Sequence, residues 1–445
     1  MKGLSCSECK GLSRRGFTIF LIASVVIFAA MEAFSQEQIP SRNPAFGIVD
    51  FQARRASLID SLGEGTAILY SRGGDSEAGY RADGDFWYLT GLDQPGAILV
   101  LSPNEIDKEV LLLPQRNIEE ERWTGERPAL SESLQAAWGF DRIFRVASLD
   151  GLIVSRMKHS PTLHLISRPA GPSSDIPADL EYYGKVSARI PGVSIKNSSR
   201  FLEKLRMVKD EKEIDAVSTA IEVTYNGLSD LVSGIRPGIM EFQLKGILEQ
   251  SFKKQGAQHS AFPPIIGSGM ETTILHYEKL DRKLESGQLL LLDIGAQWDH
   301  YCADITRTVP VDGRFTEEQA KIYDIVLKAQ KAAIDAVKPG ATLRDIDDAA
   351  KNVIRKAGYI DEFIHSTSHY IGLDVHDVGD YWLPLAPGMI ITVEPGIYLP
   401  DSEIGIRIED DVLVTEKGHK VLSERIPRER KDIEVWMAGA GSRDR

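Results

Sequence analysis

The spacing of apolar residues changes its period several times along the chain, and these changes predict two domains. Residues 51–62 carry apolar side chains at helical spacing, which predicts an amphipathic helix. Short apolar runs at residues 66–70, 97–101, 109–113 and 162–166 are typical of buried strands. Strands that alternate with helical segments predict an α/β domain, which we place at residues 44–196.

The second domain, which we place at residues 197–437, begins with helical segments. Asn197-Ser198-Ser199 offers N-cap side chains for a helix over residues 200–207. Another helix is predicted to begin near Asp210, where apolar residues again recur at helical spacing, and two more are expected after it.

The pattern of this second domain then repeats itself. Its period changes to two from Leu289 onward, returns to helical spacing between residues 316 and 357, and changes to two again from Met389. Helices followed by a hairpin, twice in succession, indicate an internal duplication in an α+β domain. We expect the last residues, 438–445, to form a disordered tail.

The first predicted hairpin carries two aspartates among apolar residues. Its strand-like runs, residues 289–296 and 301–309, are separated by Gln297-Trp298-Asp299-His300. With the turn centred between Trp298 and Asp299, Asp293 is predicted to pair directly with Asp304. Directly paired residues have their Cβ atoms about 4.5–5.5 Å apart, so two carboxylates would face each other.

The second predicted hairpin repeats this arrangement with two glutamates. Residues 390–398 and 405–414 flank its loop. Paired residues of a hairpin lie equally far from the centre of the turn, so Glu394 is predicted to lie opposite Glu409. Paired like charges are destabilising, and a buried ionised carboxylate costs several kcal/mol without compensation. One pair alone would favour a hairpin with solvent-facing acids, but two pairs in one domain favour a site for divalent metal.

Three of the nine histidines fall within twelve residues, at His365, His369 and His376. His365 and His369 have the spacing of a helical zinc pair, but the Ser/Thr residues between them and the β-branched residues after them favour a loop that leads into a strand. We therefore predict one direct metal ligand, His369, with the other two histidines lining the pocket.

Composition narrows the range of functions. The chain has 445 residues, of which 42% are hydrophobic, so it is long enough for two globular domains. Its formal net charge of -13 argues against a nucleic-acid partner. Two of its three cysteines lie in the first 35 residues, so removal of that segment would leave only Cys302 and no internal disulfide.

Residues 1–35 have the layout of a signal peptide. Basic residues precede an apolar run at residues 17–30, and Ala33-Phe34-Ser35 follows. The run is shorter than the roughly 20 residues that span a bilayer, so we expect no stable membrane insertion after cleavage. Ser13-Arg14-Arg15-Gly16-Phe17 resembles a twin-arginine motif. We expect export to the periplasm or the exterior by this route or by ordinary secretion; the alternative is an uncleaved leader that anchors the chain.

The five predicted metal-binding residues stand in the order and context of the pita-bread metallopeptidases, which the chain resembles. Within that group it is similar to aminopeptidase P. The similar segments are residues 274–277, 303–308, 372–377, 393–396 and 405–410, and in the N-terminal half Tyr80-Arg81, residues 85–91 and residues 123–125. The resemblance implies an aminopeptidase P N-terminal domain followed by a pita-bread catalytic domain. Ser366-Thr367 departs from the family, where glycine and an apolar residue are more frequent.

The resemblance implies two divalent metal ions, with Mn²⁺ the first expectation and Zn²⁺, Co²⁺ or Fe²⁺ as competitors. It implies that Asp304 and Glu409 bridge the ions. Asp293 would then bind one ion, and His369 together with Glu394 would bind the other.

The same resemblance implies roles for further residues. Glu394 would transfer a proton, His276 and His376 would stabilise the reaction intermediate, and His365 would line the proline pocket. Tyr398 and Trp123 resemble residues near the substrate, although Trp123 fits a packing anchor equally well. Arg407 lies two strand positions from Glu409, so it is predicted to face the same side and hold that carboxylate, with a surface salt bridge as its alternative role.

The activity implied by the resemblance is release of the N-terminal residue from peptides whose second residue is proline. A homo-oligomer, dimer or tetramer, is implied as well, because the N-terminal domain of this family often reaches a neighbouring subunit. Two alternatives remain open. One is a prolidase, which cleaves only dipeptides with C-terminal proline, and the other is a catalytically inactive peptide-binding module.

Overall fold

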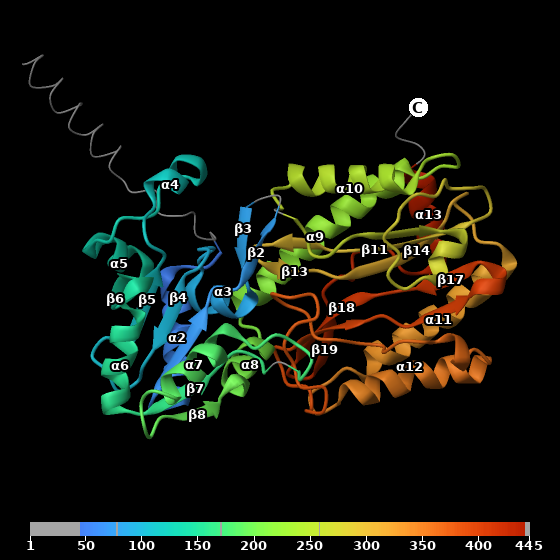
Figure 1. The fold of residues 1–445 in the computed structure, drawn as a ribbon. Helices are drawn as coiled ribbons and strands as arrows, with labels where there is room; N and C mark the ends of the chain where they lie inside the picture. Colours follow the sequence, from blue (N-terminus) through green and yellow to red (C-terminus); the bar gives the residue numbers. More distant parts are fainter. Residues whose placement is uncertain (1–44, 77–78, 170, 258, 441–445) are drawn as a thin grey trace, which may run out of the picture.

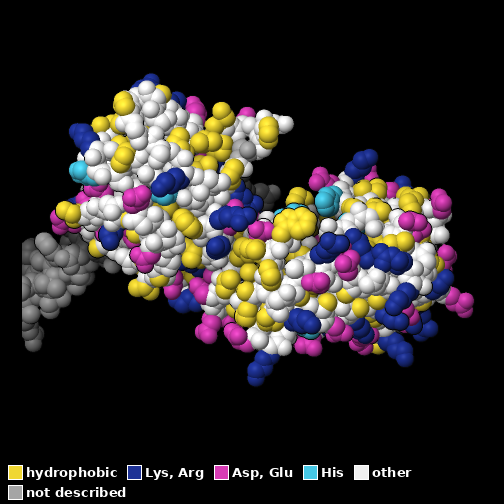
Figure 2. Space-filling model, turned by 90° about the horizontal axis from the view of Figure 1, so that it is seen from below, with side chains coloured by type: hydrophobic (Ala, Val, Ile, Leu, Met, Phe, Trp, Pro, Cys, Tyr) yellow, Lys and Arg dark blue, Asp and Glu magenta, His cyan; other side chains and the backbone are white. Residues whose placement is uncertain are grey.

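The computed structural model describes residues 45–76, 79–169, 171–257 and 259–440. The predicted leader, residues 1–35, lies outside these ranges. Figure 1 shows an N-terminal lobe in blue to green beside a C-terminal lobe that runs from yellow-green to red. Figure 2 shows charged side chains of both signs scattered over one face of both lobes. Within the described ranges, no helix combines the length and the apolar character needed to cross a membrane.

A mixed six-stranded sheet forms the centre of the N-terminal lobe. Its strands lie in the order β6 (Arg142–Arg145), β5 (Glu109–Leu113), β4 (Ile98–Leu101), β1 (Thr66–Tyr70), β7 (Thr162–Leu165) and β8 (Ser194–Asn197). β1 runs antiparallel to β4 and parallel to β7. The four predicted strands are confirmed to within one residue at each end. β8 ends at Asn197 and α8 begins at Ser199, so the predicted domain boundary after residue 196 lies next to the junction of these two elements.

Both faces of this sheet are buried, which explains its continuous apolar runs. Leu99 packs into the core that the two lobes share, whereas Val100 packs into a separate core on the other face. The remaining elements of the lobe are α2 (Ile48–Leu62), β2 (Gly73–Ser76), β3 (Gly79–Ala82), α3 (Gly84–Thr90), α4 (Ile118–Thr124), α5 (Glu132–Trp138), α6 (Leu149–His159) and α7 (Ala178–Ser187). α2 therefore begins three residues before the predicted helix.

The C-terminal lobe confirms the predicted duplication of helices followed by a hairpin. Its first half comprises α8 (Ser199–Met207), α9 (Glu211–Gly234), α10 (Glu241–Lys254), β9 (His259–Ser260), β10 (Ile265–Ser268), β11 (Leu289–Ile294), β12 (Ala296–Trp298), β13 (Tyr301–Cys302) and β14 (Ile305–Pro310). Its second half comprises α11 (Glu317–Ala336), α12 (Leu343–Ala357), β15 (Ile390–Val393), β16 (Gly396–Leu399), β17 (Ile404–Arg407), β18 (Asp410–Thr415) and β19 (Gly418–Val421). Figure 1 shows the helix pairs α9–α10 and α11–α12 on the outside of the strands.

The ends of two helices test further predictions. Asp210 caps α9, since its side chain accepts the Glu213 N–H at 2.9 Å and its own N–H donates to Glu213 Oε2 at 3.0 Å. At the other end of the domain, α13 spans Arg430–Ala440. Residues 438–440 are therefore helical, and the prediction that a disordered tail begins at residue 438 is wrong. Residues 441–445 lie outside the described ranges.

The predicted register of the first hairpin is wrong. Asp293 pairs with Thr306, not with Asp304. The turn consists of Asp299 and His300, both with positive φ (50° and 68°), so it is centred one residue later than predicted. The strands are also interrupted, because Ala303 and Asp304 lie between β13 and β14.

The predicted register of the second hairpin is confirmed. Val393 pairs with Asp410 on one side of the interruption, and Gly396 pairs with Arg407 on the other. Continuing either ladder places Glu394 opposite Glu409. Both glutamates lie where the strands are interrupted, as Asp304 does in the first hairpin.

Candidate active site

A cavity of about 570 Å³ lies between the two hairpins. It is lined by nine of the eleven predicted site residues, namely His276, Asp293, Asp304, His365, His369, His376, Glu394, Arg407 and Glu409. These residues come from both halves of the duplicated domain. The sequence therefore predicts most of these lining residues, even though the predicted register of one hairpin is wrong.

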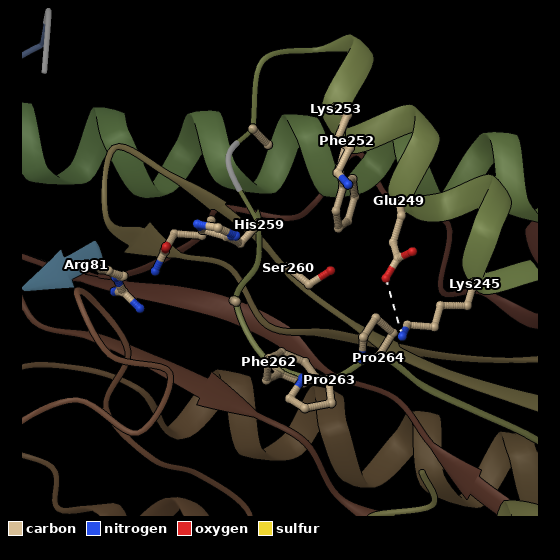
Figure 3. A pocket seen from close by; sticks show the side chains of 13 residues that line it. Arg81, Lys245, Glu249, Phe252, Lys253, His259, Ser260, Phe262, Pro263 and Pro264 are labelled. Atoms are coloured by element: carbon tan, nitrogen blue, oxygen red, sulfur yellow. Dashed lines mark ion pairs between the residues drawn. The ribbon is translucent and has the colours of Figure 1, made fainter. Parts of the chain in front are cut away.

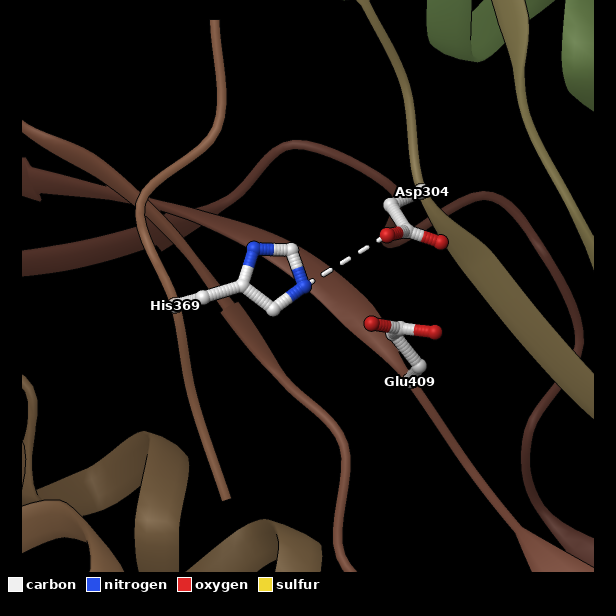
Figure 4. A group of neighbouring side chains, drawn as sticks. All are labelled: Asp304, His369 and Glu409. Atoms are coloured by element: carbon white, nitrogen blue, oxygen red, sulfur yellow. Dashed lines mark ion pairs between the residues drawn. The ribbon is translucent and has the colours of Figure 1, made fainter. Parts of the chain in front are cut away.

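Asp304, His369 and Glu409 form the centre of this cavity, and all three are buried (Figure 4). One side-chain ligand atom from each lies within 4.8 Å of the others. His369 Nε2 is 3.5 Å from Asp304 Oδ2 and 3.6 Å from Glu394 Oε1. The three acidic side chains thus approach one imidazole nitrogen from two different hairpins.

The backbone fixes these side chains in place. His369 lies in a loop, as predicted, and its carbonyl accepts the Thr392 N–H at 2.9 Å. Its Nδ1 donates to the Tyr370 carbonyl at 3.1 Å, which leaves Nε2 as the nitrogen with a free lone pair toward the carboxylates. In the first hairpin, a Cβ at Gly295 would lie 1.8 Å from the Ala303 carbonyl oxygen, so only glycine permits this close approach beside Asp304.

Arg407 holds Asp293 and not Glu409, which corrects its predicted contact. Its Nη2 donates to Asp293 Oδ2 at 2.7 Å, and its Nε donates to Thr306 Oγ1 at 3.1 Å. Thr306 in turn donates to Glu409 Oε2 at 2.7 Å. The Arg407 side chain is only 4% exposed, so the alternative of a surface salt bridge is wrong.

Burial and mutual repulsion make the carboxylates difficult to ionise. Burial raises the pKa of Asp304 well above its ordinary value, and the charges of Glu409 and Asp293 raise it further. The pKa of Glu409 is raised in the same way by burial and then by Glu394 and Asp293. Burial also raises the pKa of Glu394 to about 8, although Arg407 opposes this shift. Arg407 therefore compensates only part of the negative charge that these carboxylates would carry.

The residues fit a divalent metal ion. Among the described residues, Asp293 Oδ1 and Asp304 Oδ1 are buried and have no hydrogen-bond partner. Burial lowers the pKa of His369 to about 4, so its imidazole is neutral at pH 7 and able to donate a lone pair. A divalent cation would satisfy both unpaired oxygens and compensate the clustered negative charge.

The remaining predicted residues lie around this centre. His365 Nδ1 donates to the Ser366 carbonyl, so its Nε2 accepts the Tyr398 hydroxyl proton at 2.8 Å. The Tyr398 oxygen accepts a bond from Arg407 Nη1 at 2.9 Å, which places Tyr398 behind the cavity wall. The His376 ring lies edge-on to that of His369 at 4.3 Å, and His276 is an exposed residue of the wall.

Trp123 does not line this cavity. It lies on α4 of the N-terminal lobe and is 90% exposed. Because the side chain is so exposed, its alternative role as a packing anchor is wrong, whereas its predicted place near the substrate stays a prediction.

Sequence reasoning missed two residues that support the centre. Asp411 Oδ2 accepts the Asp304 N–H at 3.2 Å, and Thr306 joins Arg407 to Glu409. Asp411 lies two strand positions from Glu409, so the same-face argument applied to Arg407 could have found it. The cavity wall also includes Phe262 and Pro263, for which the sequence offers no signal.

Comparisons with known proteins agree with this site. Residues 215–416 match the model of metallopeptidase family M24, and residues 51–165 match that of the aminopeptidase P N-terminal domain. The Xaa-Pro aminopeptidase of Escherichia coli (strain K12) is 32% identical over 433 residues, which cover 88% of this chain and 98% of that relative.

Two further relatives place the chain within the family. The structure of the aminopeptidase PepP of Pseudomonas aeruginosa matches with a TM-score of 0.80 and 31% identity, covering 89% of this chain and 99% of that one. The Xaa-Pro dipeptidase of Pyrococcus furiosus is 40% identical over 227 residues, but these cover only 50% of this chain and 65% of that relative. The chain therefore belongs to the aminopeptidase P group of metallopeptidase family M24 and is a metal-dependent peptidase.

Proposed function

We propose that this chain is an Xaa-Pro aminopeptidase, which releases the N-terminal residue from peptides with proline in the second position. One observation carries this proposal: the similarity to the Escherichia coli Xaa-Pro aminopeptidase spans 98% of that protein. It therefore includes the N-terminal domain as well as the catalytic one. The cavity adds support, because it contains the carboxylates, histidines and arginine that such a hydrolysis requires.

Five side chains would hold two divalent ions, namely Asp293, Asp304, His369, Glu394 and Glu409. Four carboxylates and one neutral imidazole form an oxygen-rich donor set, which suits Mn²⁺, with Zn²⁺, Co²⁺ and Fe²⁺ as competitors. Asp304 and Glu409 would bridge the two ions. Asp293 would bind one ion, and His369 with Glu394 the other. Such ions, when bound, lower the pKa of water and polarise the scissile carbonyl.

The surrounding side chains would move protons and orient the peptide. Glu394 Oε1 lies near His369 and its Oε2 lies 3.8 Å from His365 Nδ1, so Glu394 stands between the metal centre and the proposed proline pocket. This position suits a carboxylate that takes a proton from water and returns it to the departing proline nitrogen. His276 and His376, both in the wall, would stabilise the oxygen of the attacked carbonyl.

The proposed proline pocket lies at His365, which Tyr398 holds from behind the cavity wall. Proline forms a tertiary amide without an N–H, so a site that binds this position cannot use the backbone donor of ordinary peptides. The His365 ring lines the cavity and offers an apolar surface to a pyrrolidine ring instead, and the Tyr398 ring supports it from behind at 5.5 Å. Burial lowers the pKa of His365 to about 4, so its ring is uncharged near neutral pH.

A prolidase is the second candidate, favoured by the 40% identity between the catalytic half and the Pyrococcus furiosus Xaa-Pro dipeptidase. An assay with purified residues 36–445 and Mn²⁺ separates the candidates. We expect free N-terminal amino acid from an Xaa-Pro-Yaa tripeptide, and no release after EDTA treatment or in Glu394→Ala. Cleavage of an Xaa-Pro dipeptide alone would establish a prolidase. Failure to cleave either, with metal bound, would favour the inactive peptide-binding module.

We also propose that residues 1–35 direct export to the periplasm or the exterior. The support is the order of basic residues, apolar run and small residues in the sequence. N-terminal sequencing of the exported protein is expected to begin at Gln36. Substitution of both Arg14 and Arg15 by lysine tests the twin-arginine route, since it would block export only if that route is used. Recovery of the intact chain in the membrane fraction would favour the anchored alternative.

We propose a homo-oligomer, dimer or tetramer, in which Trp123 of one chain reaches the cavity of its neighbour. The support is the family resemblance together with the 90% exposure of Trp123, which one chain leaves uncovered. Light scattering after gel filtration tests the assembly. Trp123→Ala is expected to lower peptide cleavage, and Trp382→Ala, an exposed tryptophan of the other lobe, serves as its control.

A further inference from the structure

Two glutamates in neighbouring cavities differ in how their charges are compensated. Phe262 and Pro263 line the catalytic cavity and also a second cavity, of about 420 Å³, which Figure 3 shows beside α10. Glu249 lines the second cavity, and one of its oxygens lies 3.4 Å from Lys245 Nζ (dashed line in Figure 3). Glu278 lines the catalytic cavity. Unlike Glu249, Glu278 forms no ion pair with any of the described residues.

The backbone around Glu278 is fixed against α10. Tyr277 is buried, and its hydroxyl donates to Glu241 Oε2 at 2.9 Å. On the other side of Glu278, the Leu280 carbonyl accepts the Phe242 N–H at 3.1 Å. Two bonds to the first turn of one helix therefore hold Glu278 at the cavity wall, and its backbone requires little ordering when a ligand binds.

Glu278 is the carboxylate of this wall that the proposed metal centre does not use. Two divalent ions would neutralise the four others, those of Asp293, Asp304, Glu394 and Glu409. The guanidinium of Arg407 is engaged by the same centre, because its Nη2 donates to Asp293 Oδ2 at 2.7 Å. Arg282, four positions after Glu278, lies 3.3 Å from Glu271 instead. A negative charge therefore remains at the wall of the metal-loaded cavity.

The position of Glu278 relative to the reacting bond follows from His276. Both residues line the cavity, one on each side of the buried Tyr277. The Cα atoms of residues two positions apart are separated by at most about 7 Å. Because His276 is proposed to stabilise the attacked carbonyl, Glu278 lies within reach of a long side chain on the first residue of the peptide or on the residue after the proline.

We propose that Glu278 is a specificity-determining residue that binds a cationic side chain, an ammonium or a guanidinium, of the peptide substrate. The inference rests on the proposed aminopeptidase function and adds a preference to it. The cationic side chain has two possible sources with the same chemistry, the first residue of the peptide or the residue after the proline. Coulomb attraction by this exposed carboxylate would favour arginine over citrulline, a neutral analogue of similar shape.

The test compares peptide amides that differ only by arginine or citrulline, placed at the first or the third position, with proline always second. The enzyme is the Mn²⁺-loaded mature chain. At one of these positions we expect kcat/KM for arginine to exceed that for citrulline about two- to fivefold, the range of an exposed ion pair. Added salt is expected to reduce the ratio. Glu278→Gln is expected to abolish this preference, and Glu278→Lys is expected to reverse it.

Glu285→Gln is the matched control. It removes the same charge from an exposed glutamate seven positions along the chain, which does not line the catalytic cavity. This variant is expected to keep the ratio of the unsubstituted enzyme. The position at which the ratio responds to Glu278→Gln identifies the source of the cationic side chain. Thermal unfolding of each variant shows that a lost ratio does not reflect a lost fold.

Two results would overturn the subsite while leaving the aminopeptidase function intact. One is an equal ratio in the Glu278→Gln and Glu285→Gln variants at both positions. The other is a loss of kcat/KM in Glu278→Gln that is the same for arginine and citrulline peptides, because it would assign Glu278 to the α-amino group that every peptide carries. Absence of cleavage of both kinds of peptide by the unsubstituted enzyme would instead overturn the proposed function, and the subsite with it.

Discussion

Arg407 Nη2 donates to Asp293 Oδ2 at 2.7 Å and so joins the two hairpins of the duplicated domain. The same guanidinium reaches Glu409 through the Thr306 hydroxyl. One buried cation therefore orients a carboxylate from each hairpin. It opposes part of their repulsion but leaves Asp293 Oδ1 without a hydrogen bond and available to a metal ion.

This relationship makes Arg407→Lys an informative substitution. Lysine keeps the charge but cannot donate to Asp293, Thr306 and Tyr398 at once in the planar geometry of a guanidinium. We expect kcat/KM or Mn²⁺ affinity to fall by about 10- to 100-fold, as is typical when the partner of a metal ligand is lost. Arg344→Lys, at an 80% exposed side chain, is the control. An effect no larger than that of the control would contradict the positioning role.

The number of bound ions tests the assignment of the central carboxylate. Asp304→Asn removes a charge from the proposed bridging position, so we expect elemental analysis to find fewer than two Mn²⁺ per chain. The rise in melting temperature on adding Mn²⁺ should shrink as well, because a ligand stabilises the folded state only in proportion to its binding. Asp335→Asn, at an exposed position of α11, should change neither result. Full occupancy in Asp304→Asn would remove Asp304 from the ligand set.

The two hairpins illustrate how far sequence reasoning reaches. The register of Glu394 and Glu409 could be predicted because their turn is centred where a simple count places it. The register of Asp293 could not, because the turn at Asp299 and His300 adopts positive φ at two residues that are not glycine. His300 stacks on Trp87 of the other lobe at 4.4 Å, so a contact between the lobes supports this turn.

Contacts between the two halves of the domain could not be predicted from the sequence either. The residue types and their spacing indicated carboxylates and a histidine for metal binding. The partner of Arg407 was predicted to be Glu409, since spacing along one strand gives only the face of a side chain. Its actual partner, Asp293, depends on how the two hairpins pack against each other.

Thr367, where the chain departs from the family pattern, offers a third test. The residue is fully buried, and its hydroxyl donates to Asp347 Oδ1 at 2.8 Å. Its carbonyl accepts the Glu394 N–H at 2.8 Å. Thr367→Val removes the hydroxyl bond at nearly constant volume, so we expect the free energy of unfolding to fall by about 1–3 kcal/mol and activity to fall with it.

Thr367→Ser is the control for this substitution, because it keeps the hydroxyl and loses only a methyl group. Urea unfolding and peptide cleavage are measured for both variants. If valine were tolerated better than serine, packing of the methyl group and not the bond to Asp347 would hold this loop beside Glu394.

A buried ion cluster joins the lobes and leads to a prediction about pH. Arg206 donates to Asp377 Oδ1 at 2.6 Å and to Asp85 Oδ1 of α3 at 2.6 Å, and Lys209 donates to Asp377 Oδ2 at 3.1 Å. Burial acts to raise the pKa of Asp377, but the charges of Arg206 and Lys209 outweigh it and hold the pKa below its ordinary value. Asp377 directly follows His376, so this cluster also fixes a wall of the catalytic cavity.

The sign of the pH effect follows from this lowered pKa. The folded state favours the ionised carboxylate, so its contribution to stability is present above about pH 4, the pKa of an unfolded aspartate, and is lost as the pH falls through the lower folded value. Arg206→Met leaves a buried carboxylate with only Lys209, and we expect a loss of about 3–5 kcal/mol at pH 7. Because protonation of Asp377 relieves that charge, the difference from the unsubstituted protein should shrink toward pH 4. Urea unfolding of the metal-free protein at several pH values measures it. A difference that is constant with pH would show that lost packing, and not the uncompensated charge of Asp377, destabilises the variant.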